Sequence, residues 1–158
     1  MIWRVFINPI MLFFLRSPFH FLASHSVVVL HVVGAKSGKQ YFIPVSFFEH
    51  DKGLLTCVTD KPNIWWRNLV GIEKIKILFK GKEVQSKIKI EPENFDYIFP
   101  KLNALFTHSR IDGFFGKVGY KEGKPIENDV QEAAKRMVLI LSLIHISEPT
   151  RLRRISYA

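Results

Sequence analysis

One short turn-forming stretch constrains the fold more than any other part of the chain. Gly34-Ala35-Lys36-Ser37-Gly38-Lys39 lies between two runs that favour β-strands, Ser26–Val33 and Tyr41–Glu49. Glycines adopt positive φ values and let the backbone approach a ligand closely. Successive N–H groups of such a turn form a concavity that binds anions, and the lysines add positive charge. The stretch therefore predicts a hairpin whose tip holds a phosphate group.

Length and composition indicate a folded, single-domain protein. The 158 residues are enough for one domain with a buried core, and a hydrophobic content of 47% excludes a disordered chain. The net charge of +9 predicts attraction to an anionic partner, such as a phosphorylated ligand, nucleic acid or membrane lipid. The only cysteine, Cys57, excludes an internal disulfide and favours a reducing, cytoplasmic location.

The remaining pattern favours strands over helices. Glu73–Lys80 and Glu83–Glu91 alternate apolar and polar residues around Gly81-Lys82, which indicates a hairpin with a lysine-rich polar face. Pro44 fits a strand edge or a bulge, because proline cannot donate to a sheet ladder. Further strands are expected at 54–59 and 136–140, helices at 64–70, 95–106 and 127–135, and a loop at 109–124. The pattern predicts a mainly β fold, a small β-barrel with peripheral helices.

The N-terminal stretch Met1–Ser24 is rich in phenylalanine, leucine and isoleucine. Arg4, Pro9, Arg16 and Pro18 interrupt it, so no apolar run reaches the roughly 18–20 residues that span a bilayer. We expect a helix that packs on the barrel. The alternative is a helix at a membrane interface, with its arginines at lipid headgroups.

The C-terminal segment is expected to be of foreign origin. Leu141–Arg151 resembles the in-frame translation of a transposase-type sequencing adapter. Residues 141–158 are therefore expected to be a non-native tail, and residues 1–140 a single domain that includes the N-terminal helix. The native C-terminus would then be missing, and no site is placed on the tail. The alternative is a native terminal strand followed by a basic segment.

The side chains exclude several classes of site. The histidines lack paired ligand spacing and Cys57 is single, so no metal site is expected. Neither Cys57 nor Ser37 has a local motif that links it to a base, and Gly34–Lys39 lacks the spacing of a nucleotide phosphate loop. Nucleic-acid binding is disfavoured because the aromatic residues are not interleaved with basic ones. No catalytic side chain is assigned.

A second informative stretch, Trp65-Trp66-Arg67-Asn68-Leu69, lies on the short helix expected after Asn63, its predicted N-cap. Adjacent helical residues point about 100° apart, so the two tryptophans cannot face one core equally. We expect one tryptophan to pack inward and the other to border a cleft, with Trp65 mainly structural. Arg67 is either an anion contact or a surface charge.

Together the two stretches resemble the deazaflavin-dependent nitroreductase (F420H2-dependent quinone reductase) family, whose fold is the split β-barrel of FMN-binding, flavin-reductase-like proteins. The resemblance rests on Gly34–Gly38 with Pro44 after it, Trp65–Leu69, Asn8-Pro9 and Gly123-Lys124-Pro125, and it covers about residues 2–140. It implies an oxidoreductase that transfers a hydride from reduced coenzyme F420 to a quinone, nitroaromatic or similar acceptor. The cofactor would supply the chemistry.

The resemblance also implies the residues of the site. Those expected to bind the cofactor are Lys36, Ser37, Gly38, Lys39, Pro44, Thr59, Lys61, Trp65, Arg67 and Asn68. Those expected to line the acceptor site are Ser46, Phe114, Phe115 and Tyr120, with ordinary packing as the alternative for these four. Ala35 and Gln40-Tyr41 stand where the family usually has arginine, so FMN is the alternative cofactor.

A function of another class also stays open. A non-enzymatic barrel at a membrane surface would bind anionic lipid through the N-terminal helix and the lysine-rich hairpin. The two functions are compatible, because a quinone is itself a membrane substrate. A homodimer is compatible with either.

Overall fold

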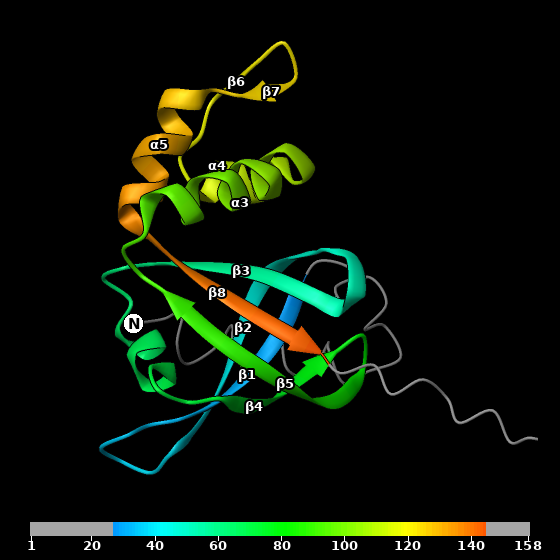
Figure 1. The fold of residues 1–158 in the computed structure, drawn as a ribbon, viewed down its shortest axis with the longest axis vertical. Coiled ribbons are helices and arrows are strands. Elements are labelled where there is room, and N and C mark those ends of the chain that lie inside the picture. The colour runs from blue at the N-terminus through cyan, green and yellow to red at the C-terminus, as the bar shows by residue number, and fades with distance from the viewer. Residues whose placement is uncertain (1–26, 145–158) are drawn as a thin grey trace, which may run out of the picture.

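Six antiparallel strands close into a barrel in the order β1-β2-β3-β8-β5-β4 in the computed structural model, which describes residues 27–144 (Figure 1). The barrel strands are β1 (Val27–Val33), β2 (Gln40–Glu49), β3 (Leu54–Asp60), β4 (Lys74–Phe79), β5 (Lys82–Glu91) and β8 (Met137–Ile144). The other elements are the 3-10 helices η2 (Asp51–Gly53) and η3 (Ile64–Leu69), the helices α3 (Phe95–His108), α4 (Arg110–Phe115) and α5 (Glu127–Arg136), and the small hairpin β6 (Tyr120–Lys121) and β7 (Lys124–Pro125). The predicted mainly β barrel with peripheral helices is confirmed.

Both predicted hairpins form, and their sequences explain the pairing. Strand β2 pairs with β1 over Gln40–Ser46 but with β3 only over Phe47–Glu49. Pro44 therefore lies where β2 has one neighbour, and its missing N–H costs no ladder bond, as predicted. Between β4 and β5, Lys80 and Gly81 both have positive φ values, 47° and 78°, which suit a two-residue hairpin turn.

The barrel interior is filled by alternate residues of each strand and closed at one end by η3. Trp66 and Leu69 of η3 belong to the same cluster as Leu30, Cys57 and Ile140. Trp66 is thus the inward tryptophan, and Trp65 is only partly buried against the cluster. Burial, with a smaller effect of Asp112, raises the pKa of the Cys57 thiol. That cysteine is therefore an inert core side chain.

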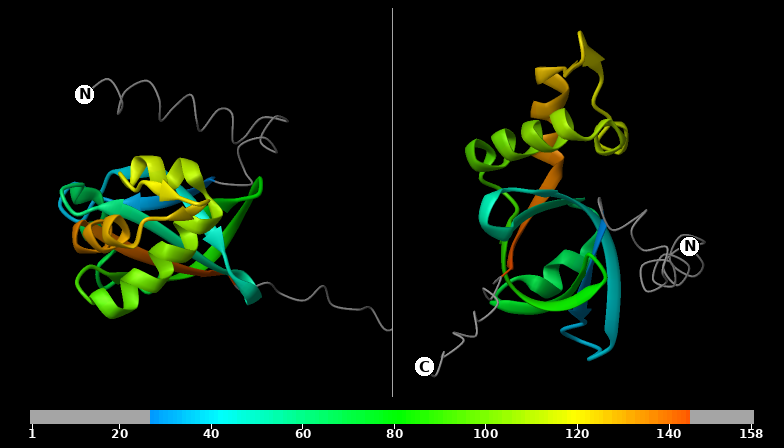
Figure 2. Two further views of the ribbon diagram at one scale, coloured as in Figure 1. Left: turned by 90° about the horizontal axis from the view of Figure 1, so that it is seen from above. Right: turned by 90° about the vertical axis from the view of Figure 1, so that its right-hand side faces the viewer.

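The helices cover one side of the barrel (Figure 2). A second cluster fills the space between α3, α5 and the outward faces of β3 and β8. Its fully buried members include Leu102, Leu105, Phe106, Val130 and Leu139. Asn94 caps α3 by accepting a hydrogen bond from the N–H of Tyr97 at 3.2 Å. The helix layer and the barrel therefore share β3 and β8 as a common wall.

Three local expectations differ from the structure. The segment 109–124, predicted as a loop, contains α4 and the β6–β7 hairpin. Asn63 precedes η3 but does not cap it, because its side chain donates to Thr59 Oγ1 at 3.2 Å. Strand β8 begins at Met137, one residue after the expected start, and continues to Ile144, beyond the expected domain end at residue 140.

The extension of β8 includes the first residues of the segment that resembles an adapter. Ser142 and Ile144 face the interior in register with Ile140, and the Ser142 hydroxyl lies 2.6 Å from that of Ser86. Residues 141–144 therefore complete a barrel strand, while their foreign origin stays a prediction. The expected N-terminal helix and residues 145–158 lie outside the described residues. Within residues 27–144, no helix is long and apolar enough to cross a membrane.

Candidate functional site

The β1–β2 turn is shaped by hydrogen bonds between its own residues. The N–H of Gly38 donates to the carbonyl of Gly34 at 2.8 Å, and the N–H of Gly34 donates to the carbonyl of Lys39 at 2.9 Å. Gly38 has a φ of 64°, and a Cβ on Gly34 would lie 2.6 Å from Ser37 Oγ. The positive φ therefore favours glycine at Gly38, and a side chain at Gly34 would displace the Ser37 hydroxyl.

Asn68 joins this turn to η3. Its Oδ1 accepts a hydrogen bond from the N–H of Ala35 at 3.0 Å, and its Nδ2 donates to the carbonyl of Trp65 at 3.0 Å. The two partners fix which end of the amide faces the turn. The two stretches that carry the family resemblance thus form one structural unit.

The turn offers fewer free donors than the sequence predicted. The N–H groups of Gly34, Ala35, Gly38 and Lys39 are engaged. Those of Lys36 and Ser37 have no acceptor among the residues that the structure describes. The side chains of Lys36, Lys39 and Arg67 are exposed. The available anion ligands are therefore two backbone N–H groups and nearby cationic side chains.

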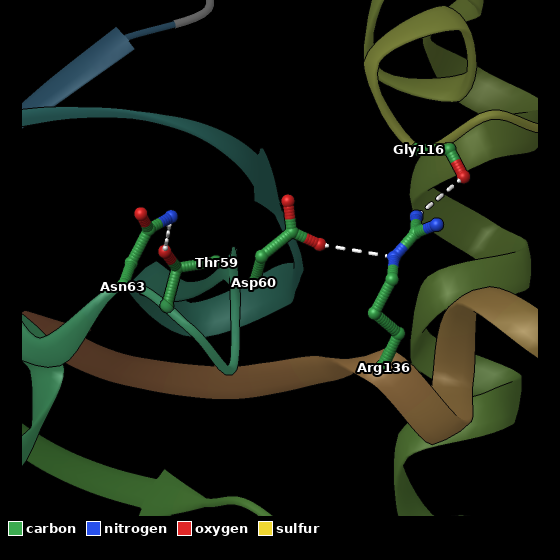
Figure 3. A network of polar contacts seen from close by, with 5 residues as sticks. All are labelled: Thr59, Asp60, Asn63, Gly116 and Arg136. Carbon is green, nitrogen blue, oxygen red and sulfur yellow. Dashed lines mark hydrogen bonds and ion pairs between the residues drawn. The ribbon is translucent and has the colours of Figure 1, made fainter.

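Thr59 lies at the end of β3, where the chain turns toward η3 (Figure 3). Lys61 directly follows this strand. The Thr59 hydroxyl is buried and accepts the bond from Asn63. The backbone of Lys61 is also engaged: its N–H donates to the carbonyl of Arg136 at 3.0 Å, and its carbonyl accepts from Trp66 Nε1 at 3.2 Å. The side chain of Lys61 is half-exposed and that of Asn63 is exposed, so both can contact a ligand at this loop.

A polar network around Arg136 was not predicted from the sequence (Figure 3). Arg136 Nε lies 3.1 Å from Asp60 Oδ1, and Nη2 donates to the carbonyl of Gly116 at 2.9 Å. The network links the end of β3 to the end of α4. No local pattern predicts it, because its three members are far apart in the sequence. Both charged side chains are about one-third exposed or more, so the ion pair contributes at most about 1 kcal/mol.

The predicted acceptor residues do not gather at the turn. Phe114 and Phe115 are exposed on α4, and Tyr120 begins β6; Figures 1 and 2 place this region at the end of the molecule opposite the β1–β2 turn. Ser46 is half-buried on the outward face of β2 and pairs with Val27, at the other end of the hairpin from the turn. Within a single copy of the protein, these four residues therefore do not lie at the candidate cofactor site.

Tyr120 has a packing role. Its hydroxyl donates to the carbonyl of Phe106 at 2.8 Å, and Arg110 lies over its ring at 5.3 Å from the centroid. Burial raises the pKa of this hydroxyl, Arg110 lowers it, and Asp112 raises it. The contacts favour the packing alternative for this residue.

Comparisons with solved structures identify the fold. A proposed 5-nitroimidazole antibiotic resistance protein from Bacteroides thetaiotaomicron VPI-5482 matches with a TM-score of 0.53 and 11% identity, over 80% of this chain and 77% of that one. A pyridoxamine 5′-phosphate oxidase-related, FMN-binding protein from Nostoc punctiforme PCC 73102 matches with a TM-score of 0.50 and 16% identity, over 88% of this chain and 79% of that one. No protein-family model and no curated protein matches the sequence. The barrel thus has the FMN-binding split β-barrel fold, as the resemblance implied.

Proposed function

We propose that this split β-barrel is an oxidoreductase that binds reduced coenzyme F420, with FMN as the alternative, and delivers a hydride to a quinone, nitroaromatic or similar acceptor. The observation that carries the proposal is the hydrogen bond from the Ala35 N–H to Asn68 Oδ1. It joins the basic turn to the tryptophan-containing helix, and the fold is one that known flavin-binding proteins share.

The residues present fit a ligand with an anionic group. The N–H groups of Lys36 and Ser37 and the exposed side chains of Lys36, Lys39 and Arg67 supply donors and positive charge. Val33 and Val70, next to the turn and to η3, are 54% and 60% exposed. Apolar surface beside cationic side chains suits a flat ring that carries a phosphate.

The protein's part in this reaction is binding and orientation. When bound, the deazaflavin or flavin supplies the hydride chemistry. Lys36 and Lys39 would neutralise its anionic group, and Asn68 holds the turn in place against η3. Trp66 fixes η3 by packing into the barrel and by its bond to the Lys61 carbonyl. Because the cofactor carries the reaction, no side-chain acid, base or nucleophile is required.

Parallel titrations of the full chain with F420 and with FMN, followed by fluorescence, test the proposal. We expect saturable binding of at least one of them, and oxidation of the reduced form when a quinone is added. Binding of neither, or binding without oxidation by quinone or nitroaromatic acceptors, contradicts it.

The variant Lys36→Ala tests the turn itself. A charge-assisted hydrogen bond contributes about 1.5–3 kcal/mol, so its loss should weaken cofactor binding at least tenfold, since about 1.4 kcal/mol is a factor of ten. Lys82→Ala is the matched control. Lys82 is also an exposed lysine, but it begins β5, and the whole of β4 separates it from η3. Equal affinity of Lys36→Ala and Lys82→Ala would overturn the assignment of the turn.

A further inference from the structure

The end of the molecule opposite the β1–β2 turn presents three large apolar side chains to solvent. Ile111, Phe114 and Phe115 of α4 are 72%, 76% and 65% exposed. The rings of Phe114 and Phe115 pack against each other, edge to face, with centroids 5.6 Å apart. We call α4 together with the β6–β7 hairpin the α4 tip. Adjacent exposed apolar side chains of this size mark an interaction surface.

The exposure does not arise from a loosely held segment. A Cβ on Gly113 would overlap the hydroxyl of Tyr120, and a Cβ on Gly116 would lie 2.7 Å from the ring of Phe106. The carbonyl of Gly116 also accepts the bond from Arg136. Close packing on one side of α4 therefore fixes the helix so that its apolar side chains point outward.

Cationic side chains surround the apolar ones. Arg110, Lys117, Lys121 and Lys124 are exposed in this segment. Arg110 lies over the ring of Tyr120, and a Cβ on Gly123 would lie 4.0 Å from its guanidinium, so its charge is held beside the hairpin. The segment has two carboxylates, Asp112 and Glu122, and therefore carries a net positive charge. Exposed aromatic residues with flanking cations suit the headgroup region of an anionic bilayer.

We propose that the α4 tip is a docking surface for a membrane that contains anionic lipids. Phe114 and Phe115 enter the headgroup region, and the surrounding cations contact lipid phosphates and carboxylates. In Figure 1 the β6–β7 hairpin stands beyond the helices, at the end of the molecule away from the barrel, and α4 lies beside α3 in the helix layer. This surface is distinct from the lysine-rich β4–β5 face, where Lys74 stands directly opposite Lys87. That face offers charge alone and lacks the apolar group that enters the bilayer.

Sedimentation of the full chain with vesicles tests the proposal. We expect binding to phosphatidylcholine vesicles that contain phosphatidylserine, and much weaker binding to phosphatidylcholine alone. The double variant Phe114→Ala, Phe115→Ala should bind the anionic vesicles about tenfold more weakly. The matched control replaces two exposed apolar residues near the turn, Ile64→Ala with Ile72→Ala, and should bind as the wild type does.

A second variant distinguishes insertion from a general loss of affinity. The tryptophan fluorescence of Phe115→Trp should be quenched by brominated lipid in anionic vesicles more strongly than that of the wild type.

The charges are tested separately. The double variant Lys121→Gln, Lys124→Gln should weaken vesicle binding and reduce its salt dependence, whereas the control Lys76→Gln, Lys82→Gln should not. Absence of quenching at position 115, or equal binding by the phenylalanine double variant, overturns the proposal. So does self-association that this double variant abolishes, because a second copy would then occupy the tip.

Discussion

The two ends of the molecule both expose apolar side chains beside lysines, yet they are held by different forces. At the β1–β2 turn, backbone hydrogen bonds and the Asn68 amide hold a segment that is almost entirely exposed. At the α4 tip, glycines let α4 pack directly on Phe106 and Tyr120. Substitutions that disturb the packing of α4 on Phe106 and Tyr120 should therefore change the free energy of unfolding. Substitutions in the turn should mainly change ligand binding.

The largest expected effect on stability is at Gly113. An alanine there would force its methyl group into Tyr120, with the Cζ atom at 2.8 Å, so either α4 moves or Tyr120 loses its bond to the Phe106 carbonyl. Such overpacking costs about 3 kcal/mol. We expect Gly113→Ala to lower the free energy of unfolding by that amount in urea titrations, and to disorder the tip.

Gly38→Ala in the turn is the matched comparison. Gly38 has a φ of 64°, but a Cβ added there would meet no atom within 4 Å, so the substitution adds only backbone strain of about 1 kcal/mol. If Gly38→Ala destabilised the protein as much as Gly113→Ala, the contrast between a packed end and a tethered end would be wrong.

The sequence predicted the barrel well because its information is local. Alternation in the β4–β5 region, β-branched residues in β1 and the glycine-containing turns each specify a strand or a hairpin without knowledge of the rest of the chain. The α4 tip was predicted as a loop because its helix has only six residues and depends on contacts with Phe106 and Tyr120. Nothing in the spacing of Gly113 and Gly116 reveals those contacts.

The candidate site shows the same limit. Lys36, Ser37 and Asn68 were identified through a family resemblance, and the structure adds the bond that unites their two segments. Arg136 was not predicted because its partners, Asp60 and Gly116, come together only when the barrel and the helix layer assemble. The position of Phe114 and Phe115 at the opposite end depends on the same assembly.

A smaller effect on stability is expected at Asn68. Replacement by alanine removes the acceptor for the Ala35 N–H and the donor to the Trp65 carbonyl, at exposed or half-buried positions. We expect a loss of about 1 kcal/mol in the free energy of unfolding, because a net hydrogen bond contributes about 0.5–1.5 kcal/mol, and a clear loss of cofactor affinity. Chemical unfolding and fluorescence titration measure the two quantities separately.

Two further variants sharpen the test. Asn68→Asp keeps the acceptor for Ala35 but loses the donor to Trp65, so it should retain more affinity than Asn68→Ala. Asn128→Ala, at an exposed position on α5, is the matched control and should change neither quantity. Unchanged affinity in Asn68→Ala would show that the tether between the turn and η3 has no part in binding.

The smallest expected effect is a pH dependence of the helix-covered side. His50 Nε2 lies 2.8 Å from Thr56 Oγ1, and its ring packs on Phe48. Burial lowers the pKa of His50 below its usual 6.5, Lys101 lowers it further, and Asp51 opposes them. Because the unfolded chain binds this proton more readily, stability is fully present above the unfolded pKa and is lost as the pH falls toward the folded value.

Unfolding in urea at about pH 7 and about pH 5.5 should therefore show a loss of stability on acidification that is smaller in His50→Gln than in the wild type. Glutamine can still hydrogen-bond Thr56, so the comparison isolates the charge rather than the contact. This pH effect is expected on the helix-covered side of the molecule, because protonation of His50 is costly where its ring is partly buried. An identical pH response in His50→Gln and wild type would place the acid sensitivity elsewhere and remove this difference between the two regions.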